Sequence, residues 1–265
     1  MAAVRLILTL LVALSIGVVP MPRSGRADAA EPGIEIWLPL APPNVRQEGD
    51  VLTGYLVELI KLAASRADVP IDHHEIVPYS RALKEITTSA NYCNGLVART
   101  PEREKLFSWV APTRRIIISV FAHADMRDPP QTPEDLKKHE VAVQRGTLGD
   151  LTLTELGIPA TRISETGHLI TMMKSDRVAV FVADYGTGMA VARDAAVELV
   201  ELMQLTEKVG YFACSPRLDP EIARRLGDAF KDIFAKGLDR PLAKDEFDSA
   251  VYERIRPLPD TGLQN

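Results

Sequence analysis

Short hydrophobic runs alternate with amphipathic segments along the first half of the chain. Strand-like runs lie at residues 34–38, 72–77 and 92–98, and helices are expected from Gly54 and from about Ser80. The first of these helices has one apolar face, formed by Leu56, Leu59, Ile60, Ala63 and Ala67. Strands separated by helices in this way predict a parallel sheet covered by helices on both faces, so the fold class is α/β.

The second half repeats this alternation after a polar, proline-rich patch at residues 125–131. The patch follows a β-branched run at residues 116–122 and is the best candidate for a domain crossing. Thr132 then predicts a helix start, because Pro133 follows it and Asp135 lies three residues after the cap. The remaining expected elements are a strand (140–144), a helix closed by Gly157, a helix (167–175), a strand (178–182), a helix (186–193), two extended runs (197–202 and 209–215) and a helix (220–236).

The N-terminus has the features of an export signal. Arg5 precedes an uncharged apolar stretch, residues 6–19, and Ala27-Asp28-Ala29 supplies the small residues of a cleavage site. The stretch is shorter than the roughly 18–20 residues of a bilayer-spanning helix, which disfavours a retained anchor. We therefore expect residues 1–29 to be removed. No cysteine precedes Cys93, so a lipid anchor is not expected, and the predicted location is the periplasm.

Composition narrows the classes of partner. The formal net charge is −5, and it becomes −7 once residues 1–29 are removed with their three arginines and one aspartate. An acidic chain disfavours nucleic acid, because phosphate binding needs a basic face. Cys93 and Cys214 both lie in apolar, strand-like surroundings. In an exported chain they form either a disulfide or two buried thiols.

The sequence offers little for catalysis. It has no Ser-His-Asp order, no glycine-rich phosphate loop and no Cys-x-x-Cys motif. His73 and His74 are neighbours in a predicted strand, so their side chains point to opposite faces and do not converge on one metal ion. We therefore expect no enzyme activity, no cofactor and no metal site.

Two segments, about forty residues apart, carry groups that suit a small carboxylate: LVARTPEREKLFSWV at residues 96–110 and VQRGT at residues 143–147. Together they resemble the extracellular solute-binding proteins of ABC importers, in the family that binds polar amino acids (family 3). GYLVELIKLAASRADVPI, which starts at Gly54, is similar to the family's first helix. The run Thr100-Pro101-Glu102-Arg103, followed by Phe107-Ser108 and Pro112, looks like its signature after the third strand. Residues 132–136, 141–147 and 177–184 are similar to the family's second lobe.

The resemblance implies a two-lobed, type II periplasmic-binding-protein-like fold with a hinge of two crossing strands. Residues 1–29 would be the signal peptide, residues 30–122 the first part of lobe I and residues 123–209 lobe II. Residues 210–265 would return to lobe I and form the C-terminal helices. In such a fold the returning strand lies beside the third strand, which would bring Cys93 close to Cys214.

Arg103 is the strongest candidate for a ligand-binding residue. A guanidinium presents a rigid fork of donors to a carboxylate, and in the family this arginine holds the α-carboxylate of an amino acid. The alternative is a solvated side chain in the charged run at residues 102–105. Gly146 and Thr147 lie between a strand and a helix, where unpaired amides attract anions. Thr147 is also a helix-cap candidate, and Leu148 stands where the family usually has a second hydroxyl.

Other candidates complete the predicted site. Asp184 follows the strand at residues 178–182, and the resemblance implies that its carboxylate takes the ligand's α-ammonium. It could instead cap the next helix. Ala98 ends the third strand and belongs to the predicted ligand-binding set, with Tyr79 and Arg81 expected as a cleft wall. If Arg81 lines the cleft, the ligand has a second acidic or strongly polar end.

The function implied by the resemblance is periplasmic capture of a small amino acid or related carboxylate for an ABC transporter. The expected partners are that small molecule and an inner-membrane ABC permease, with the protein itself a monomer. Two alternatives remain open at this stage. One is a ligand-binding sensor for a membrane receptor, and the other is a dehydratase-like enzyme that uses Asp184 or Glu165 as an acid.

Overall fold

The computed structural model describes residues 33–164 and 166–257. The predicted signal peptide lies outside the described residues. Within the described part of the chain, every helix falls short of the length and hydropathy that a membrane crossing requires.

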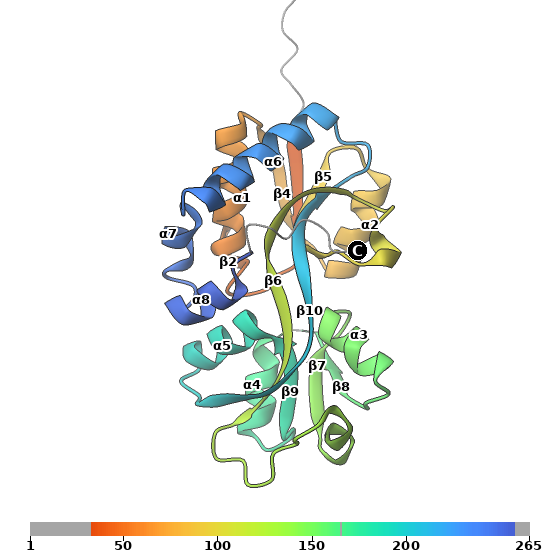
Figure 1. Ribbon diagram of the computed structural model, residues 1–265, viewed down its shortest axis with the longest axis vertical. Helices are drawn as coiled ribbons and strands as arrows, with labels where there is room; N and C mark the ends of the chain where they lie inside the picture. The colour runs from red at the N-terminus through yellow and green to blue at the C-terminus, as the bar shows by residue number, and fades with distance from the viewer. Residues whose placement is uncertain (1–32, 165, 258–265) are drawn as a thin grey trace, which may run out of the picture. The chain divides into compact units, whose positions relative to one another are not determined.

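Eight of the described strands are hydrogen-bonded in one series, in the order β4-β1-β5-β10-β6-β9-β7-β8. They are β1 (Ile34–Leu38), β4 (Ile71–Ile76), β5 (Tyr92–Ala98), β6 (Ser108–His123), β7 (Val141–Gln144), β8 (Thr161–Ile163), β9 (Val180–Asp184) and β10 (Leu199–Cys214). A separate hairpin pairs β2 (Arg46–Glu48) with β3 (Val51–Thr53). The two longest strands, β6 and β10, pair along their length and run through the middle of Figure 1.

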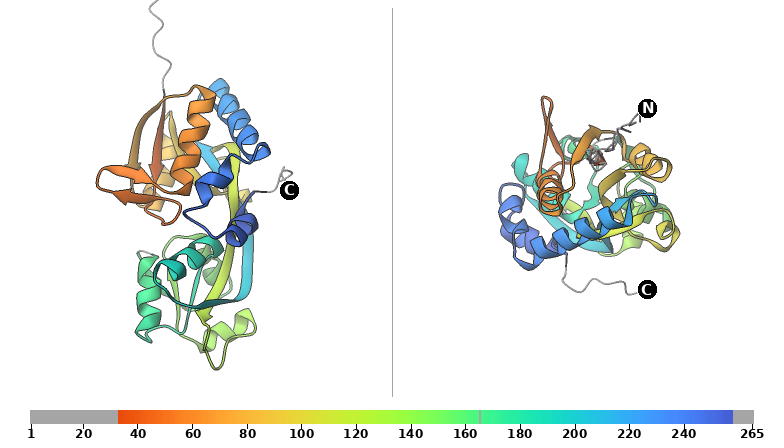
Figure 2. Two further views of the ribbon diagram at one scale, coloured as in Figure 1. Left: turned by 90° about the vertical axis from the view of Figure 1, so that its left-hand side faces the viewer. Right: turned by 90° about the horizontal axis from the view of Figure 1, so that it is seen from above.

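Helices gather beside both ends of the β6–β10 pair (Figures 1 and 2). The first group comprises α1 (Tyr55–Ala67), α2 (Tyr79–Thr88), α6 (Pro220–Ala235), α7 (Asp239–Ala243) and α8 (Ser249–Ile255). The second comprises α3 (Leu148–Glu155), α4 (Gly167–Lys174) and α5 (Tyr185–Asp194). Each group and its strands form a lobe, and the chain returns to the first lobe after β10. This arrangement confirms the predicted two-lobed α/β fold.

Each lobe contributes its own parallel strands. β4, β1 and β5 are parallel in the first lobe, and β9, β7 and β8 are parallel in the second. β5 is antiparallel to the end of β10 at residues 210–214, whereas β9 is antiparallel to β6 at residues 118–122. The predicted parallel arrangement is therefore present within each lobe, and the two crossing strands add antiparallel pairing to it.

β10 is one continuous strand where the sequence predicted two extended runs. Its last five residues are buried, whereas the preceding ones are partly or fully exposed. Apolar and polar residues are mixed along residues 199–209, so no continuous apolar run identifies this stretch as a strand. Pairing with β6 defines it instead.

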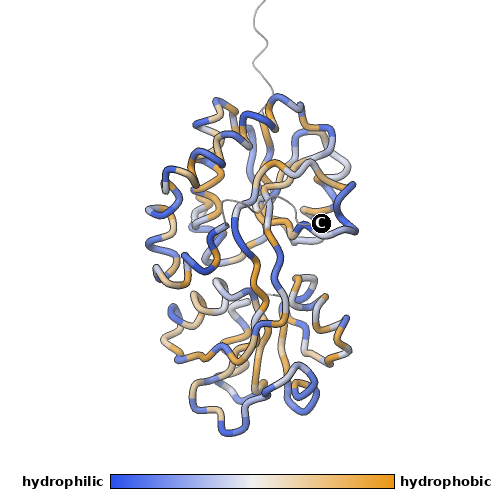
Figure 3. The backbone as a smooth tube through the Cα atoms, viewed as in Figure 1, coloured by the Kyte–Doolittle hydropathy of each residue, from blue (hydrophilic) through white to orange (hydrophobic). Residues whose placement is uncertain are grey.

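Hydrophobic cores form separately in the two lobes. The predicted apolar face of the first long helix is confirmed, since its five named residues are all buried in α1. The last long helix, α6, also buries one face, formed by Ile222, Leu226, Ala229, Phe230 and Ile233. In the first lobe Phe212 of β10 packs against Phe230 of α6, with ring centroids 5.2 Å apart. In the second lobe Phe121 stacks on Phe181, also at 5.2 Å. Figure 3 shows hydrophobic strands inside each lobe and hydrophilic stretches on β6 and β10 between them.

Helices α5 and α8 bring the two lobes into direct contact. The Arg254 guanidinium of α8 lies 3.9 Å from the centroid of the Tyr185 ring of α5. Gly186 leaves no room for a side chain here, because a Cβ atom would lie 2.8 Å from Ile255. Arg46 of β2 adds an ion pair at 3.0 Å to Asp194, the last residue of α5. These contacts hold the second lobe against the β2 strand and the C-terminal helices of the first lobe.

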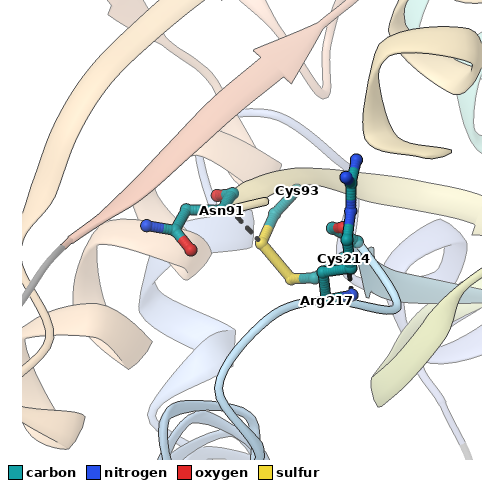
Figure 4. The surroundings of a disulfide bond; sticks show 5 residues. Asn91, Cys93, Cys214 and Arg217 are labelled. Carbon is teal, nitrogen blue, oxygen red and sulfur yellow. Dashed lines mark hydrogen bonds between the residues drawn. A yellow bond between two sulfur atoms is a disulfide. The ribbon is translucent and has the colours of Figure 1, made fainter. Parts of the chain in front are cut away.

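A disulfide joins Cys93 of β5 to Cys214 of β10, with the Cα atoms 4.0 Å apart (Figure 4). The two residues are register partners on adjacent antiparallel strands, so the sheet itself brings their side chains together. Both are fully buried. The bond therefore links the third strand of the first lobe to the strand that returns from the second lobe.

Gly54 fixes the loop that precedes α1. Its φ is +105°, and a Cβ atom would lie 2.7 Å from the backbone oxygens of Pro43 and Asn44. We expect Gly54→Ala to lower the free energy of unfolding by about 1–3 kcal/mol, measured by urea denaturation, because strain and a backbone clash add together. Gly49→Ala is the matched control: its φ is +61°, but nothing lies within 4 Å of the added methyl group. An equal loss in both variants would contradict a role for close packing at Gly54.

Candidate functional site

A cavity of about 150 Å³ lies between the two lobes and is lined by residues from both. Hydrophobic side chains form much of its wall, including Leu56 of α1, Ile116 of β6 and Leu169 of α4. The polar side chains most relevant to ligand binding are those of Asn44, Tyr79, Arg103, Arg114, Thr147 and Asp184. The cavity therefore combines an apolar body with a few charged and hydrogen-bonding groups, which is typical of small-molecule sites.

Arg103 lines the cavity at the end of a 3-10 turn, η1 (Pro101–Arg103). The turn starts after the extended residue Thr100, with proline at its first position, and the Arg103 amide donates to the Thr100 carbonyl at 3.0 Å. In the side chain, Nη1 donates to the Ala98 carbonyl at 3.3 Å. The bond to Ala98 is long and uses one nitrogen, so other donors of the guanidinium fork can reach a ligand.

Tyr79 opens α2, lines the cavity and contacts Arg103. Burial raises the pKa of the Tyr79 phenol, and the hydrogen-bonded Arg103 guanidinium opposes that shift. The phenol is therefore protonated at neutral pH and can donate to a ligand oxygen. Tyr79, Ala98 and Arg103 form one polar corner of the cavity on the first lobe.

Arg81 is not part of this corner. Its side chain is exposed, with the guanidinium 5.2 Å from the centroid of the Trp37 ring, and it is absent from the described residues that line the cavity. The reason is helical geometry: Tyr79 begins α2 and faces the cavity, so a residue two positions later points away from it. The structure thus corrects the predicted cleft wall, keeping Tyr79 and leaving Arg81 outside.

The N-terminus of α3 is occupied by a carboxylate of the protein itself, that of Asp150. Thr147 is the helix cap, and its hydroxyl donates to the Gln144 carbonyl at 2.8 Å and accepts from the Asp150 amide. The Gly146 amide, expected to face the ligand, donates instead to the Asp150 carboxylate at 2.9 Å. Thr147 lines the cavity, whereas Gly146 is exposed and lies outside its described lining. Asp150 therefore occupies the position that the sequence assigned to a ligand carboxylate.

Asp184 lies at the end of β9, at the junction with α5, and lines the cavity. Its side chain caps α5 by accepting from the Thr187 amide at 3.1 Å, and it also accepts from the Thr187 hydroxyl. A third donor is the guanidinium of Arg114, at 2.5 Å. The alternative role as a helix cap is thus realised, together with an ion pair that the sequence analysis did not foresee.

Arg114 is the first of two cavity residues that the sequence analysis missed. It belongs to β6, has a side chain only 1% exposed and lines the cavity. Nη2 holds Asp184, but Nε and Nη1 have no hydrogen-bond partner within residues 33–164 and 166–257. One feature of the sequence could have pointed to it. Arg114 and Arg115 form a charged pair directly before a β-branched run, at the place where the strand passes from one lobe to the other.

Asn44 is a second missed residue. It is 2% exposed and lines the cavity from the loop before β2, and its Oδ1 atom lacks a donor among the described residues. An unpaired buried acceptor is costly, so this atom is suited to a hydrogen bond from a bound molecule.

Comparisons with known proteins place the fold but not a family. No family model matches the chain, and no curated protein matches it in sequence. Among solved structures, a mutant of ArgBP from T. maritima aligns with a TM-score of 0.70 at 22% identity, covering 80% of this chain and 94% of that one. The solute receptor for L-cysteine of Neisseria gonorrhoeae aligns with a TM-score of 0.71 at 14% identity, covering 85% and 96%. The chain has the fold of two-lobed periplasmic binding proteins.

The same fold occurs in proteins with other roles. A histidine kinase sensor domain with similarity to periplasmic binding proteins aligns with a TM-score of 0.71 at 16% identity, covering 81% of this chain and 95% of that one. The ancestral amino-acid-binding protein AncCDT-1, a precursor of cyclohexadienyl dehydratase, aligns with a TM-score of 0.70 at 20% identity, covering 82% and 96%. At these identities the fold is established, and the role must be argued from the site.

Proposed function

We propose that this protein is a periplasmic solute-binding protein that captures a small carboxylate in the cavity between its lobes and delivers it to an ABC permease. The observation that carries the proposal is the Arg103 guanidinium, which lines the cavity and is held there by the Ala98 carbonyl and the Tyr79 phenol. A guanidinium held this way is suited to a bidentate carboxylate. Export by a cleaved signal peptide, a monomeric state and the polar amino-acid-binding family complete the proposal.

Capture would require the lobes to move about the crossing strands. We propose the division into residues 30–122, 123–209 and 210–265, with β6 and β10 as the hinge. Charged groups tie these strands together: Arg115 of β6 pairs with Glu207 of β10 at 2.6 Å. The Arg115 guanidinium lowers the pKa of Glu207, so this pair is charged at neutral pH. Hinge closure of this kind is a common response of two-lobed proteins to a ligand.

The available chemistry favours binding over turnover. Asp184, proposed as an acid in the dehydratase alternative, is surrounded by hydrogen-bond donors and an arginine. A carboxylate that already accepts from several protein donors is engaged in holding the structure and has little room to exchange a proton with a ligand. Glu165 lies outside the described residues. A sensor would need the same capture step, so we regard sensing as a second use of the same site.

A thermal-shift panel of amino acids and organic acids tests the proposed function. A true ligand at one hundred times its dissociation constant stabilises the fold by about 2.7 kcal/mol. For a chain of this size we expect a rise in Tm of roughly 5–10 °C. Nuclear magnetic resonance of each mixture serves as the check for turnover. A panel in which no carboxylate raises Tm would contradict the proposal, and formation of a new product would favour the enzyme.

Uptake measurements separate transport from sensing. Cells that lack the protein should lose uptake of the labelled ligand if it serves a permease. Unchanged uptake together with a lost transcriptional response to the ligand would favour the sensor.

A further inference from the structure

Asp184 is already occupied as an acceptor. Four donors reach its carboxylate: Arg114 Nη2, the Ile117 amide, the Thr187 amide and the Thr187 hydroxyl. Three of these donors share Oδ2, which has no lone pair left for a ligand, and the Ile117 amide reaches Oδ1 at 3.3 Å. The Arg114 guanidinium, 2.5 Å away, also balances the negative charge. Asp184 is therefore a weak partner for an α-ammonium group.

Arg114, in contrast, still has hydrogen-bond donors to offer a ligand. Its side chain is 1% exposed, and Nε and Nη1 find no hydrogen-bond partner among residues 33–164 and 166–257. Buried donors without partners are costly, and a buried guanidinium attracts an acceptor oxygen strongly. Because Arg114 lines the cavity, a bound molecule can supply that oxygen. An ammonium group at the same place would meet a like charge in a poorly solvated site, which opposes its binding.

We propose that the ligand is an organic acid that has no α-ammonium group and presents an oxygen acceptor to Arg114. One carboxylate binds Arg103, and a keto, hydroxyl or second carboxylate oxygen binds Arg114. The inference rests on the proposed function, since it assumes that Arg103 holds a carboxylate. Asn44 Oδ1, which also lines the cavity, is a neutral acceptor and suits a ligand hydroxyl without neutralising an ammonium charge.

Matched ligands test the proposal on the wild-type protein. Calorimetry would compare glutamate, 2-oxoglutarate and glutarate, which share one skeleton and differ at the second carbon. Leucine, 4-methyl-2-oxopentanoate and 4-methylpentanoate form an apolar set for the hydrophobic wall. In the set that binds, we expect the oxo acid to bind at least about tenfold more tightly than the amino acid, the factor that corresponds to about 1.4 kcal/mol. An amino acid that binds as tightly as its oxo acid overturns the inference.

Two substitutions test the roles of the ion pair. Arg114→Gln removes the charge and should lower the ratio of oxo-acid to amino-acid affinity at least about tenfold, because Asp184 is released to meet an ammonium. Asp184→Asn should raise the same ratio at least about threefold, because Arg114 loses its balancing charge. A fall in the ratio for Asp184→Asn would show that Asp184 binds an ammonium, and it would overturn the inference even if Arg114→Gln does not fold.

Arg115→Gln is the matched control. Arg115 adjoins Arg114 on β6 and also forms an ion pair, with Glu207, but it is outside the described lining of the cavity. The affinity ratio should stay the same in this variant. If no acid of either kind binds, the proposed function fails. If an amino acid binds best and the binding depends on Arg103, only the present inference fails.

Discussion

Replacing Arg103 with alanine is expected to weaken binding of the carboxylate ligand by about 30- to 1000-fold, or roughly 2–4 kcal/mol. The side chain lines the cavity and supplies a planar fork of donors at the corner that it forms with Tyr79 and Ala98. The variant should fold normally, because its loss within the protein is limited to the Ala98 carbonyl bond and the contact with Tyr79. Calorimetry with the best ligand from the thermal-shift panel measures the change.

Two further variants separate the contribution of the Arg103 guanidinium fork from that of its positive charge. Arg103→Lys keeps the charge and removes the fork, so it should recover only part of the lost affinity. Lys105→Ala removes a positive charge from an exposed residue two positions away and should leave binding unchanged. Equal losses of affinity in Lys105→Ala and Arg103→Ala would mean that the ligand responds to the positive charge of this region and makes no specific contact with Arg103. Unchanged binding in Arg103→Ala would exclude the role proposed here.

The elements of the fold could be predicted where local chemistry decides them. The Thr132 capping box is present, with the Thr132 and Asp135 side chains bonded to each other's backbone amides, although the helix it starts is a short 3-10 turn, η2 (Pro133–Lys138). The faces of α1 and α6 were also readable, because each packs on a single core. The crossing of β6 and β10 depends on pairing between distant residues, and no local pattern contains that information.

The site shows the same division between local and distant information. Thr147 and Asp150 form a local cap pattern like that of Thr132 and Asp135, so the loss of the Gly146 amide to Asp150 could have been read from the sequence. The ion pair between Arg114 and Asp184 could not. These residues are seventy positions apart and meet only because β6 pairs with β9. A sequence motif shows which residue types are available for a ligand, whereas tertiary pairing decides which of them are already occupied.

Removing the disulfide should produce the largest loss of stability. Cys93 and Cys214 are 121 residues apart, and on the chain-entropy model a loop of this size contributes about 4–5 kcal/mol by restricting the unfolded chain. We expect the double variant Cys93→Ala/Cys214→Ala to melt roughly 8–20 °C lower than the oxidised wild type.

Wild type melted in excess reductant is the control that separates the bond from the side chains. Both cysteines are buried in the core of the first lobe, so alanine also removes packing, and the reduced wild type retains it. The reduced protein should therefore melt between the oxidised wild type and the double variant. Neither cysteine is among the described residues lining the cavity, so ligand affinity measured well below the melting temperature should not change in any of the three. Free thiols found by mass spectrometry in the protein purified without reductant, or equal melting of the oxidised and reduced forms, would contradict a stabilising disulfide between β5 and β10.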